Sequence, residues 1–160
     1  MNTVMELLQW MGAEIKYDET MVYCRKKGRL KNMPKLQTAV YPGFPTDMQS
    51  VFLALFSIGE GKGIIEEKIF ESRYGCVSEL KKMGADIDIK GKYAIVRGKT
   101  KIHGADVEAK DLRGGAALVL AGMEAEGMTR IKGGEYIVRG YENLEKELEN
   151  LGAKIRWIEK

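Results

Sequence analysis

One short phrase occurs three times in the sequence and constrains the fold more than any other feature. The copies are Met11-Gly12-Ala13-Glu14-Ile15, Met83-Gly84-Ala85-Asp86-Ile87 and Leu151-Gly152-Ala153-Lys154-Ile155. Each copy follows a short stretch with apolar residues at helical spacing, and its glycine lies where a left-handed residue ends a helix. The branched residue after it favours a strand. The copies lie about seventy residues apart, which predicts a repeated supersecondary unit rather than a solenoid.

The stretches between the copies supply the rest of this unit. Residues 15–17 and 22–24 are predicted to form a β-hairpin after the first copy, and residues 87–89 and 93–96 form its counterpart after the second. Two longer helices are predicted to begin at Asp47 and Asp111 and to end at glycines. Further strands are predicted at residues 36–40, 63–66, 105–109, 129–131 and 154–158.

The order of elements in one unit is therefore strand, helix, strand, helix, strand, strand. We expect a single domain over residues 1–160, with approximate units at 1–35, 36–103 and 104–160. The first of these contains only the back half of a unit. Helices with one apolar face must pack on the sheets, which predicts an α/β (α+β) fold of repeated βαβαββ units, the first incomplete.

Composition narrows the class of protein. Apolar residues make up 44% of the chain and charged residues 31%, as in soluble globular proteins. The sequence has no signal-peptide pattern and no apolar run long enough for a membrane span. The isolated Cys24 and Cys76 suit a reducing cytoplasm and do not have the spacing of a zinc site. The basic cluster at 25–31 is short and lacks aromatic residues, so we expect a solvated loop and no nucleic-acid partner.

The stretch Tyr41-Pro42-Gly43-Phe44-Pro45-Thr46-Asp47 is the strongest local signal of a site. Its prolines favour a stiff, extended loop, and its glycine allows a turn. Thr46 or Asp47 can cap the helix that follows, which brings a carboxylate to the positive end of that helix. The local pattern alone favours a cap for Asp47 over a catalytic role.

Four motifs, in order, resemble those of a known family. They are Pro42-Gly43-Phe44-Pro45-Thr46-Asp47-Met48-Gln49, Ile69-Phe70-Glu71-Ser72-Arg73, Asp111-Leu112-Arg113-Gly114-Gly115-Ala116-Ala117-Leu118 and Arg139-Gly140-Tyr141-Glu142. With the Gly-Ala copies, they make essentially the whole chain similar to the C-terminal part of the UDP-N-acetylglucosamine 1-carboxyvinyltransferase family, the bacterial enolpyruvyl transferases that begin peptidoglycan precursor synthesis. The related shikimate-pathway transferases share the repeat but not the first motif.

The resemblance implies two domains of repeated units, each an inside-out α/β barrel, which close on substrates in the cleft between them. It also implies that the enolpyruvyl group of phosphoenolpyruvate moves to the 3′-hydroxyl of UDP-N-acetylglucosamine. This reaction passes through a tetrahedral intermediate and releases phosphate, and the family uses no metal or organic cofactor.

The same resemblance assigns roles to individual residues. Asp47 matches the carboxylate proposed to take the proton from the sugar hydroxyl, and Asp111 matches a second carboxylate near the developing intermediate. Ile69 and Phe70 match positions that line the uridine-sugar site. From the local pattern alone, a helix cap for Asp111 and core packing for Phe70 stay open.

Three arginines lie in the matching motifs. Arg113 and Arg139 match arginines that hold the carboxylate or phosphate of phosphoenolpyruvate, which suits a planar guanidinium. Arg73 is expected to support other side chains. Taken singly, each of these arginines could instead form a surface ion pair.

The chain also departs from the family. The domain with the reactive cysteine and the Lys-Asn pair that grips substrate are expected to lie outside these residues, so we expect no transfer by the chain alone and only weak binding of UDP-N-acetylglucosamine or phosphate. The incomplete first unit is expected to expose a sheet edge and the apolar face of Val4, Leu7 and Leu8. Such surfaces favour a homo-oligomer or a swapped assembly.

Three hypotheses follow from the sequence. The chain is part of a longer transferase; or it is a stand-alone binding or scaffold module that kept the fold without the reaction; or it is an unrelated α/β domain in which Asp47, Asp111 and the arginines are caps and ion pairs.

Overall fold

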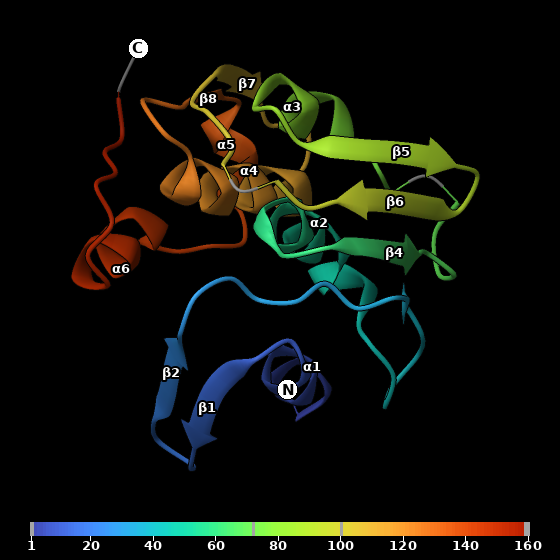
Figure 1. Ribbon diagram of the computed structural model, residues 1–160. Helices are drawn as coiled ribbons and strands as arrows, with labels where there is room; N and C mark the ends of the chain where they lie inside the picture. Colours follow the sequence, from blue (N-terminus) through green and yellow to red (C-terminus); the bar gives the residue numbers. More distant parts are fainter. Residues whose placement is uncertain (1, 72, 100, 159–160) are drawn as a thin grey trace.

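The computed structural model describes residues 2–71, 73–99 and 101–158 (Figure 1). Its elements follow the predicted order closely. They are α1 (Asn2–Trp10), β1 (Ala13–Tyr17), β2 (Val22–Lys26), β3 (Leu36–Gln37), the 3₁₀ turn η1 (Thr46–Met48), α2 (Gln49–Ile58), β4 (Lys62–Glu66), α3 (Val77–Lys82), β5 (Asp86–Lys90), β6 (Tyr93–Arg97), β7 (Asp106–Glu108), α4 (Leu112–Glu124), β8 (Arg130–Lys132), α5 (Gly134–Val138) and α6 (Leu144–Asn150).

The segment from β3 to β6 is one whole unit. Its four strands form a single sheet in the order β3-β4-β6-β5, in which β3 runs parallel to β4 and the other pairs are antiparallel. The parallel pair β7–β8 repeats the first part of this arrangement, and the hairpin β1–β2 repeats the last part. The predicted βαβαββ order is therefore confirmed.

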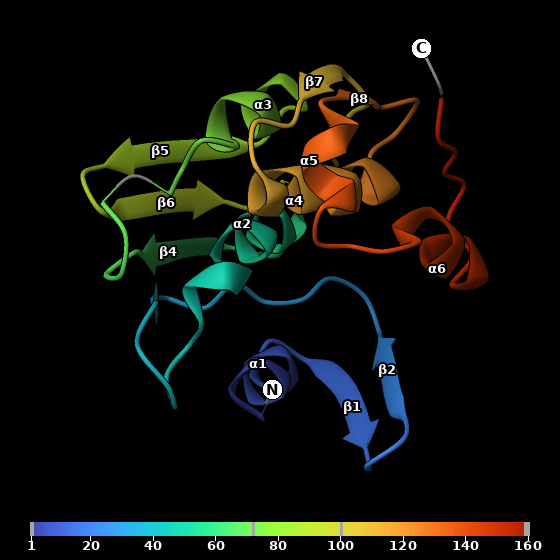
Figure 2. The same ribbon diagram turned by 180° about the vertical axis from the view of Figure 1, so that it is seen from behind.

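Helices α2 and α4 lie in the middle of the molecule, with the strands and the shorter helices around them (Figures 1 and 2). The two helices pack against each other and are buried on most of their surface. Phe52 of α2 packs edge-on against Phe44 of the preceding loop, with ring centroids 4.8 Å apart. An α/β fold with its long helices inside and its sheets outside agrees with the predicted fold class.

The three glycines of the repeated phrase end their helices as predicted. Gly12, Gly84 and Gly152 have φ values of 104°, 91° and 95°. At the second and third copies, the amide after the glycine bonds back to the carbonyl five residues earlier: Ala85 to Leu80 at 3.1 Å and Ala153 to Leu148 at 3.0 Å. This is the hydrogen-bond pattern of a Schellman cap, which needs a left-handed residue.

In two units, the segment after the β-hairpin forms the same backbone hydrogen bond to the residue that follows the short helix, α1 in one unit and α3 in the other. The amide of Lys31 donates to the carbonyl of Met11 at 2.9 Å, and the amide of His103 donates to the carbonyl of Met83 at 2.9 Å. The repeat thus extends to individual backbone contacts. The approximate unit boundaries stay a prediction.

Two strand predictions are corrected. The strand expected at 36–40 covers only Leu36–Gln37, because after Thr38 the chain turns back on itself: the amide of Ala39 donates to the carbonyl of Phe44 at 2.9 Å, and that of Gly43 to the carbonyl of Val40 at 2.8 Å. Residues 154–158 form no strand, since no neighbouring strand in the described chain offers them a hydrogen-bonded edge.

The expectation about α1 is wrong. Val4 is only 8% exposed, and Leu7 and Leu8 pack against the main core, so the apolar face of the helix is covered. The loop before η1 also contacts this helix, since Thr3 Oγ1 donates to the carbonyl of Pro42 at 2.8 Å. Exposed apolar side chains lie instead on and near the β1–β2 hairpin, at Trp10, Tyr17, Met21, Val22 and Tyr23. The other reason for expecting a homo-oligomer, an open sheet edge, is not affected by this finding, and the homo-oligomer stays a prediction.

Candidate functional site

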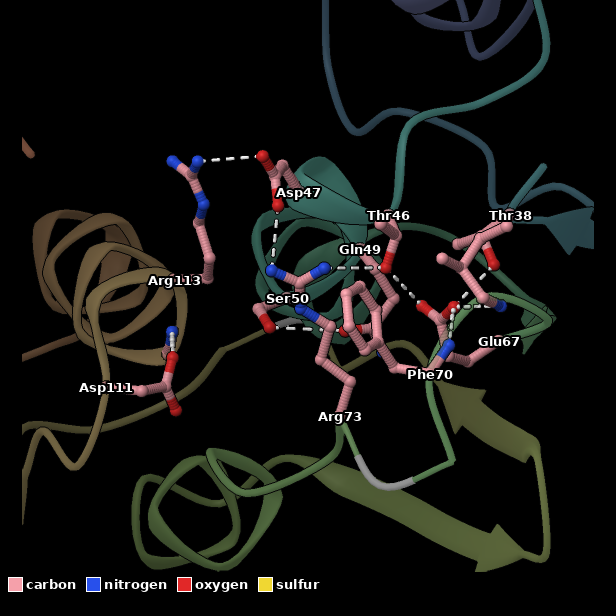
Figure 3. A network of polar contacts seen from close by, with 12 residues as sticks. Thr38, Thr46, Asp47, Gln49, Ser50, Glu67, Phe70, Arg73, Asp111 and Arg113 are labelled. Carbon is pink, nitrogen blue, oxygen red and sulfur yellow. Dashed lines mark hydrogen bonds and ion pairs between the residues drawn. The ribbon is translucent and has the colours of Figure 1, made fainter. Parts of the chain in front are cut away.

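The N-terminal ends of α2 and α4 meet at one end of the packed pair. Asp47, just before α2, accepts a hydrogen bond from Arg113 in the first turn of α4, with Oδ2 and Nη2 2.8 Å apart (Figure 3). At their other ends, Ile58 and Glu124 line a cavity of about 130 Å³. Asp47 and Arg113 thus lie at the ends where the two helices begin and present their first amides.

Asp47 lies between two guanidinium groups. Its Oδ1 accepts from Nη2 of Arg73 at 2.7 Å, and its Oδ2 accepts from Nη2 of Arg113 at 2.8 Å. Partial burial raises the pKa of this carboxyl, but the hydrogen bond from Arg73 and the charge of Arg113 outweigh it and lower the pKa overall. The side chain is 52% exposed, so the ionised carboxylate can be reached from solvent.

The predicted helix cap by Thr46 or Asp47 is wrong. The chain enters α2 through the 3₁₀ turn, in which the amide of Met48 donates to the carbonyl of Pro45 at 3.0 Å. Neither side chain accepts from a helix amide. The turn already occupies one of the amides, and the two arginines hold the carboxylate of Asp47 away from the helix end.

Arg73 reaches the site from the loop after β4. Its Nη1 donates to Oγ1 of Thr46 at 2.8 Å, while its Nη2 holds Asp47. The guanidinium also stacks on the ring of Phe70, 4.7 Å from the centroid. Arg73 thus supports Thr46 and Asp47, and it also presents a guanidinium directly beside the exposed carboxylate.

Glu67 is the site residue that the sequence analysis missed. It is 2% exposed, and its Oε1 accepts from Oγ1 of Thr38 at 2.8 Å and from the amides of Ile69 at 2.7 Å and Phe70 at 3.1 Å. Its Oε2 accepts from Oγ1 of Thr46 at 2.8 Å (Figure 3). The available signal was a carboxylate just after a predicted strand, two residues before the motif that begins at Ile69.

Ile69 and Phe70 are surface residues with a fixed backbone. Phe70 is 52% exposed and Ile69 is 41% exposed, so core packing does not account for either side chain. Because Glu67 binds both amides, the two side chains project from a backbone that is held in place.

Asp111 acts as the N-cap of α4. Its Oδ1 accepts from the amide of Gly114 at 2.7 Å, so the cap interpretation is correct for this residue. A narrow hollow beside it is lined in part by Gly75, Cys76 and Leu118. Within the described chain, no hydrogen bond joins Asp111 to Asp47 or to its arginines.

The last arginine lies apart from this network. Arg139 follows α5, and its guanidinium lies over the ring of Tyr136 at 5.6 Å from the centroid. Two residues later, the hydroxyl of Tyr141 accepts from Nη1 of Arg113 at 3.3 Å. Arg139 is thus near the site in sequence, but no ion pair among the described residues joins it to Asp47 or Asp111.

A family model described as EPSP synthase (3-phosphoshikimate 1-carboxyvinyltransferase) matches residues 1–148. The chain belongs to the EPSP synthase family. This membership excludes the hypothesis of an unrelated α/β domain.

Curated relatives of this EPSP synthase-family chain are named UDP-N-acetylglucosamine 1-carboxyvinyltransferase, which confirms the resemblance. UDP-N-acetylglucosamine 1-carboxyvinyltransferase 2 from Caldanaerobacter subterraneus is 48% identical over 150 residues. The match covers 92% of this chain and 36% of that protein. The one from Desulfofundulus thermocisternus is 49% identical over 148 residues, which are 92% of this chain and 60% of that protein. The chain therefore spans between about a third and three fifths of these relatives.

Solved structures agree with the fold. The enolpyruvyl transferase NikO from Streptomyces tendae superposes with a TM-score of 0.87 at 28% identity, covering 97% of this chain and 36% of NikO. An EPSP synthase from Acinetobacter baumannii matches with a TM-score of 0.57 at 15% identity, over 81% of this chain and 31% of that protein. The second likeness concerns the fold alone.

The two cysteines of this EPSP synthase-family chain differ in environment. Cys76 is buried beside the start of α3, and burial raises the pKa of its thiol to about 11. Cys24 is exposed on β2. Neither belongs to the network around Asp47.

Two further observations concern residues 2–71, 73–99 and 101–158 only. No helix in these ranges is long and apolar enough to cross a membrane. No group of three or more His, Cys, Asp or Glu side chains in them is arranged to hold a metal ion.

Proposed function

We propose that this chain forms one wall of an active site that transfers the enolpyruvyl group of phosphoenolpyruvate to the 3′-hydroxyl of UDP-N-acetylglucosamine. The observation that carries the proposal is the half-exposed carboxylate of Asp47 between the guanidinium groups of Arg73 and Arg113. The names of the curated relatives support the choice of reaction and of acceptor. The stand-alone binding or scaffold module is not favoured by any contact in the structure.

Asp47 is the proposed base. The sugar oxygen attacks C2 of phosphoenolpyruvate while its proton passes to the carboxylate of Asp47, and a general acid of the completed cleft gives a proton to C3 to form the tetrahedral adduct. Loss of phosphate from C2 and of a proton from C3 then restores the double bond. A base must lie within hydrogen-bond reach of the proton it removes, and Asp47 is accessible enough for that.

The arginines tune this base. In the free chain they keep Asp47 ionised and lower its basicity, since both donate to the carboxylate. An incoming carboxylate or phosphate competes for the same guanidinium donors. Binding of phosphoenolpyruvate would therefore weaken their hold on Asp47 and make it a stronger base when the acceptor arrives.

The remaining predicted residues complete the proposal. Ile69 and Phe70 offer apolar surface to the uridine-sugar part of the acceptor, and Asp111 presents its second carboxylate oxygen near the same helix ends. Arg139 is proposed to hold phosphoenolpyruvate together with Arg113, for which its guanidinium would leave the ring of Tyr136.

The whole reaction requires a second wall. Donors placed on both sides and exclusion of water account for much of the rate in such a site. We therefore propose that the domain supplying the cysteine-bearing loop completes the cleft, in a protein located in the cytoplasm. The chain alone is expected to release no phosphate from the two substrates.

A segment exchange tests the proposal. The part of the Caldanaerobacter subterraneus relative that matches this chain is replaced by the matching residues of this chain, and phosphate release is measured with both substrates. We expect turnover that depends on UDP-N-acetylglucosamine. An exchanged protein that is folded by circular dichroism and still releases no phosphate would contradict the proposal.

A further inference from the structure

We infer that Glu67 is a positioning residue that fixes both the acceptor wall and the arginine–carboxylate pair of this site through one buried carboxylate. The inference rests on the proposed function, because that function makes the positioned side chains part of an active site. The contacts of Glu67 themselves involve no substrate. Glu67 lies beneath the exposed side chains of the site and is not itself accessible.

The hydrogen bonds that link Arg73 to Glu67 through Thr46 can run in only one direction. A guanidinium can only donate hydrogen bonds, and an ionised carboxylate can only accept them. The hydroxyl of Thr46 lies between the two, 2.8 Å from Nη1 of Arg73 and 2.8 Å from Oε2 of Glu67. It must therefore accept from the arginine and donate to the glutamate. The buried negative charge thus orients the hydroxyl that holds Arg73 against Asp47.

The other oxygen of Glu67 fixes the acceptor wall. Oε1 accepts from the amides of Ile69 and Phe70 and from Oγ1 of Thr38. The hydroxyl of Thr38 in turn accepts from the amide of Lys68 at 2.8 Å. Three consecutive amides are thus bound directly or through one hydroxyl, which sets the direction of the two side chains proposed to face the uridine sugar.

The four donors on Glu67 come close to filling its acceptor sites. An ionised carboxylate offers about four lone-pair sites. Two hydroxyls and two amides occupy them here. A neutral amide at this position has two hydrogens and only one acceptor oxygen. With Oε1 still accepting from the amides, the Gln nitrogen faces Thr46, and the Thr46 hydroxyl loses the acceptor that orients it toward Arg73.

The neighbouring Glu66 shows that burial of a carboxylate at this strand end does not by itself connect it to the site. Glu66 is also 2% exposed, but its oxygens bind Nζ of Lys35 at 2.7 Å and Nζ of Lys92 at 2.8 Å. The two adjacent residues therefore serve different surfaces, and Glu66 is a matched control for the loss of one buried charge.

The experiment compares Glu67→Gln, Thr46→Val, Thr46→Ser and Glu66→Gln with the parent chain. Guanidinium signals of Arg73 and amide signals of Ile69 and Phe70 are followed by ¹H–¹⁵N NMR at a temperature where each variant is folded. We expect Glu67→Gln and Thr46→Val to shift and broaden the Arg73 signals. Thr46→Ser keeps the hydroxyl and restores them, and Glu66→Gln leaves them unchanged.

Only Glu67→Gln is expected to shift the amide signals of both Ile69 and Phe70 strongly, because they contact its carboxylate and not the Thr46 hydroxyl. If the Arg73 signals of Glu67→Gln equal those of the parent, the inference is overturned. Should that variant fail to fold, the Thr46 pair decides: Arg73 signals equal to the parent's in Thr46→Val overturn it, and signals altered there but restored in Thr46→Ser support it. This experiment needs no substrate. A negative result here would therefore refute the role of Glu67 without touching the proposed reaction, and a failed segment exchange would refute the reaction without touching the role of Glu67.

Discussion

Asp47 and Arg113 lie 66 residues apart in the chain, and a hydrogen bond of 2.8 Å joins their side chains. Each stands at the start of the long central helix of its own unit. Because successive units place equivalent helices side by side, a repeat can bring residues from distant parts of a sequence to one site. The site is therefore a property of the contact between units.

Asp111 is predicted to have separable effects on stability and on function. Asp111→Ala removes the cap and should lower the free energy of unfolding by about 1 kcal/mol, whereas Asp111→Asn retains a capping oxygen and should change it by only a few tenths. Urea unfolding of both variants measures this. Equal losses in the two variants would contradict the capping role seen at the Gly114 amide.

Glu66 is predicted to make the chain sensitive to acid. Hydrogen bonds from Lys35 and Lys92 lower the pKa of its carboxyl from 4.5 to about 2. The unfolded carboxyl binds its proton at higher pH than the folded one, so this stabilisation is complete above about pH 4.5 and is lost as the pH falls toward 2.

The matching measurement is urea unfolding between pH 6 and pH 2 for the parent and Glu66→Gln. The free energy of unfolding of the variant should fall less steeply across the window between pH 4.5 and 2. Parallel curves for the two proteins would show that Glu66 is not the group responsible.

The two thiols are predicted to react at very different rates. Cys24 is exposed, whereas Cys76 is buried with the pKa of its thiol raised to about 11, so little of it is thiolate at neutral pH. A disulfide reagent such as DTNB should modify one thiol quickly in the native chain and both in guanidinium chloride. Cys24→Ser should remove the fast phase, and a fast phase that persists in this variant would refute the assignment.

Gly115 is predicted to control how closely α5 packs on α4. A Cβ there would lie 2.6 Å from Cγ1 of Ile137, so Gly115→Ala should destabilise the chain by about 1–3 kcal/mol through overpacking. Gly75 is the control, because a Cβ there would have ordinary contacts, 3.8 Å from Oδ2 of Asp111. Thermal unfolding of both Ala variants measures the difference, and similar losses would argue against close packing at Gly115.

The repeated units and their order could be predicted from the sequence because their signals are local. A glycine after an apolar helical stretch needs the left-handed region, and Gly12, Gly84 and Gly152 all adopt it. The cap by Asp111 is local in the same sense, since donor and acceptor are three residues apart.

The arrangement around Asp47 could not be predicted locally. Asp47 has the same residue type and a similar position as Asp111, yet it binds arginines from two other segments instead of capping its helix. The same holds for Glu67, whose four donors come from three separate stretches of chain. Tertiary contacts also cover the apolar face of α1, which was expected from the sequence to be exposed.

The most direct test of the account measures steady-state phosphate release by the exchanged enzyme with Asp47→Asn. We predict that kcat falls by about 100-fold or more, the usual contribution of a general base. The KM for phosphoenolpyruvate should not rise, because the guanidinium groups that bind it remain and no longer face a competing carboxylate. A kcat equal to that of the exchanged enzyme with Asp47 intact would contradict the central claim.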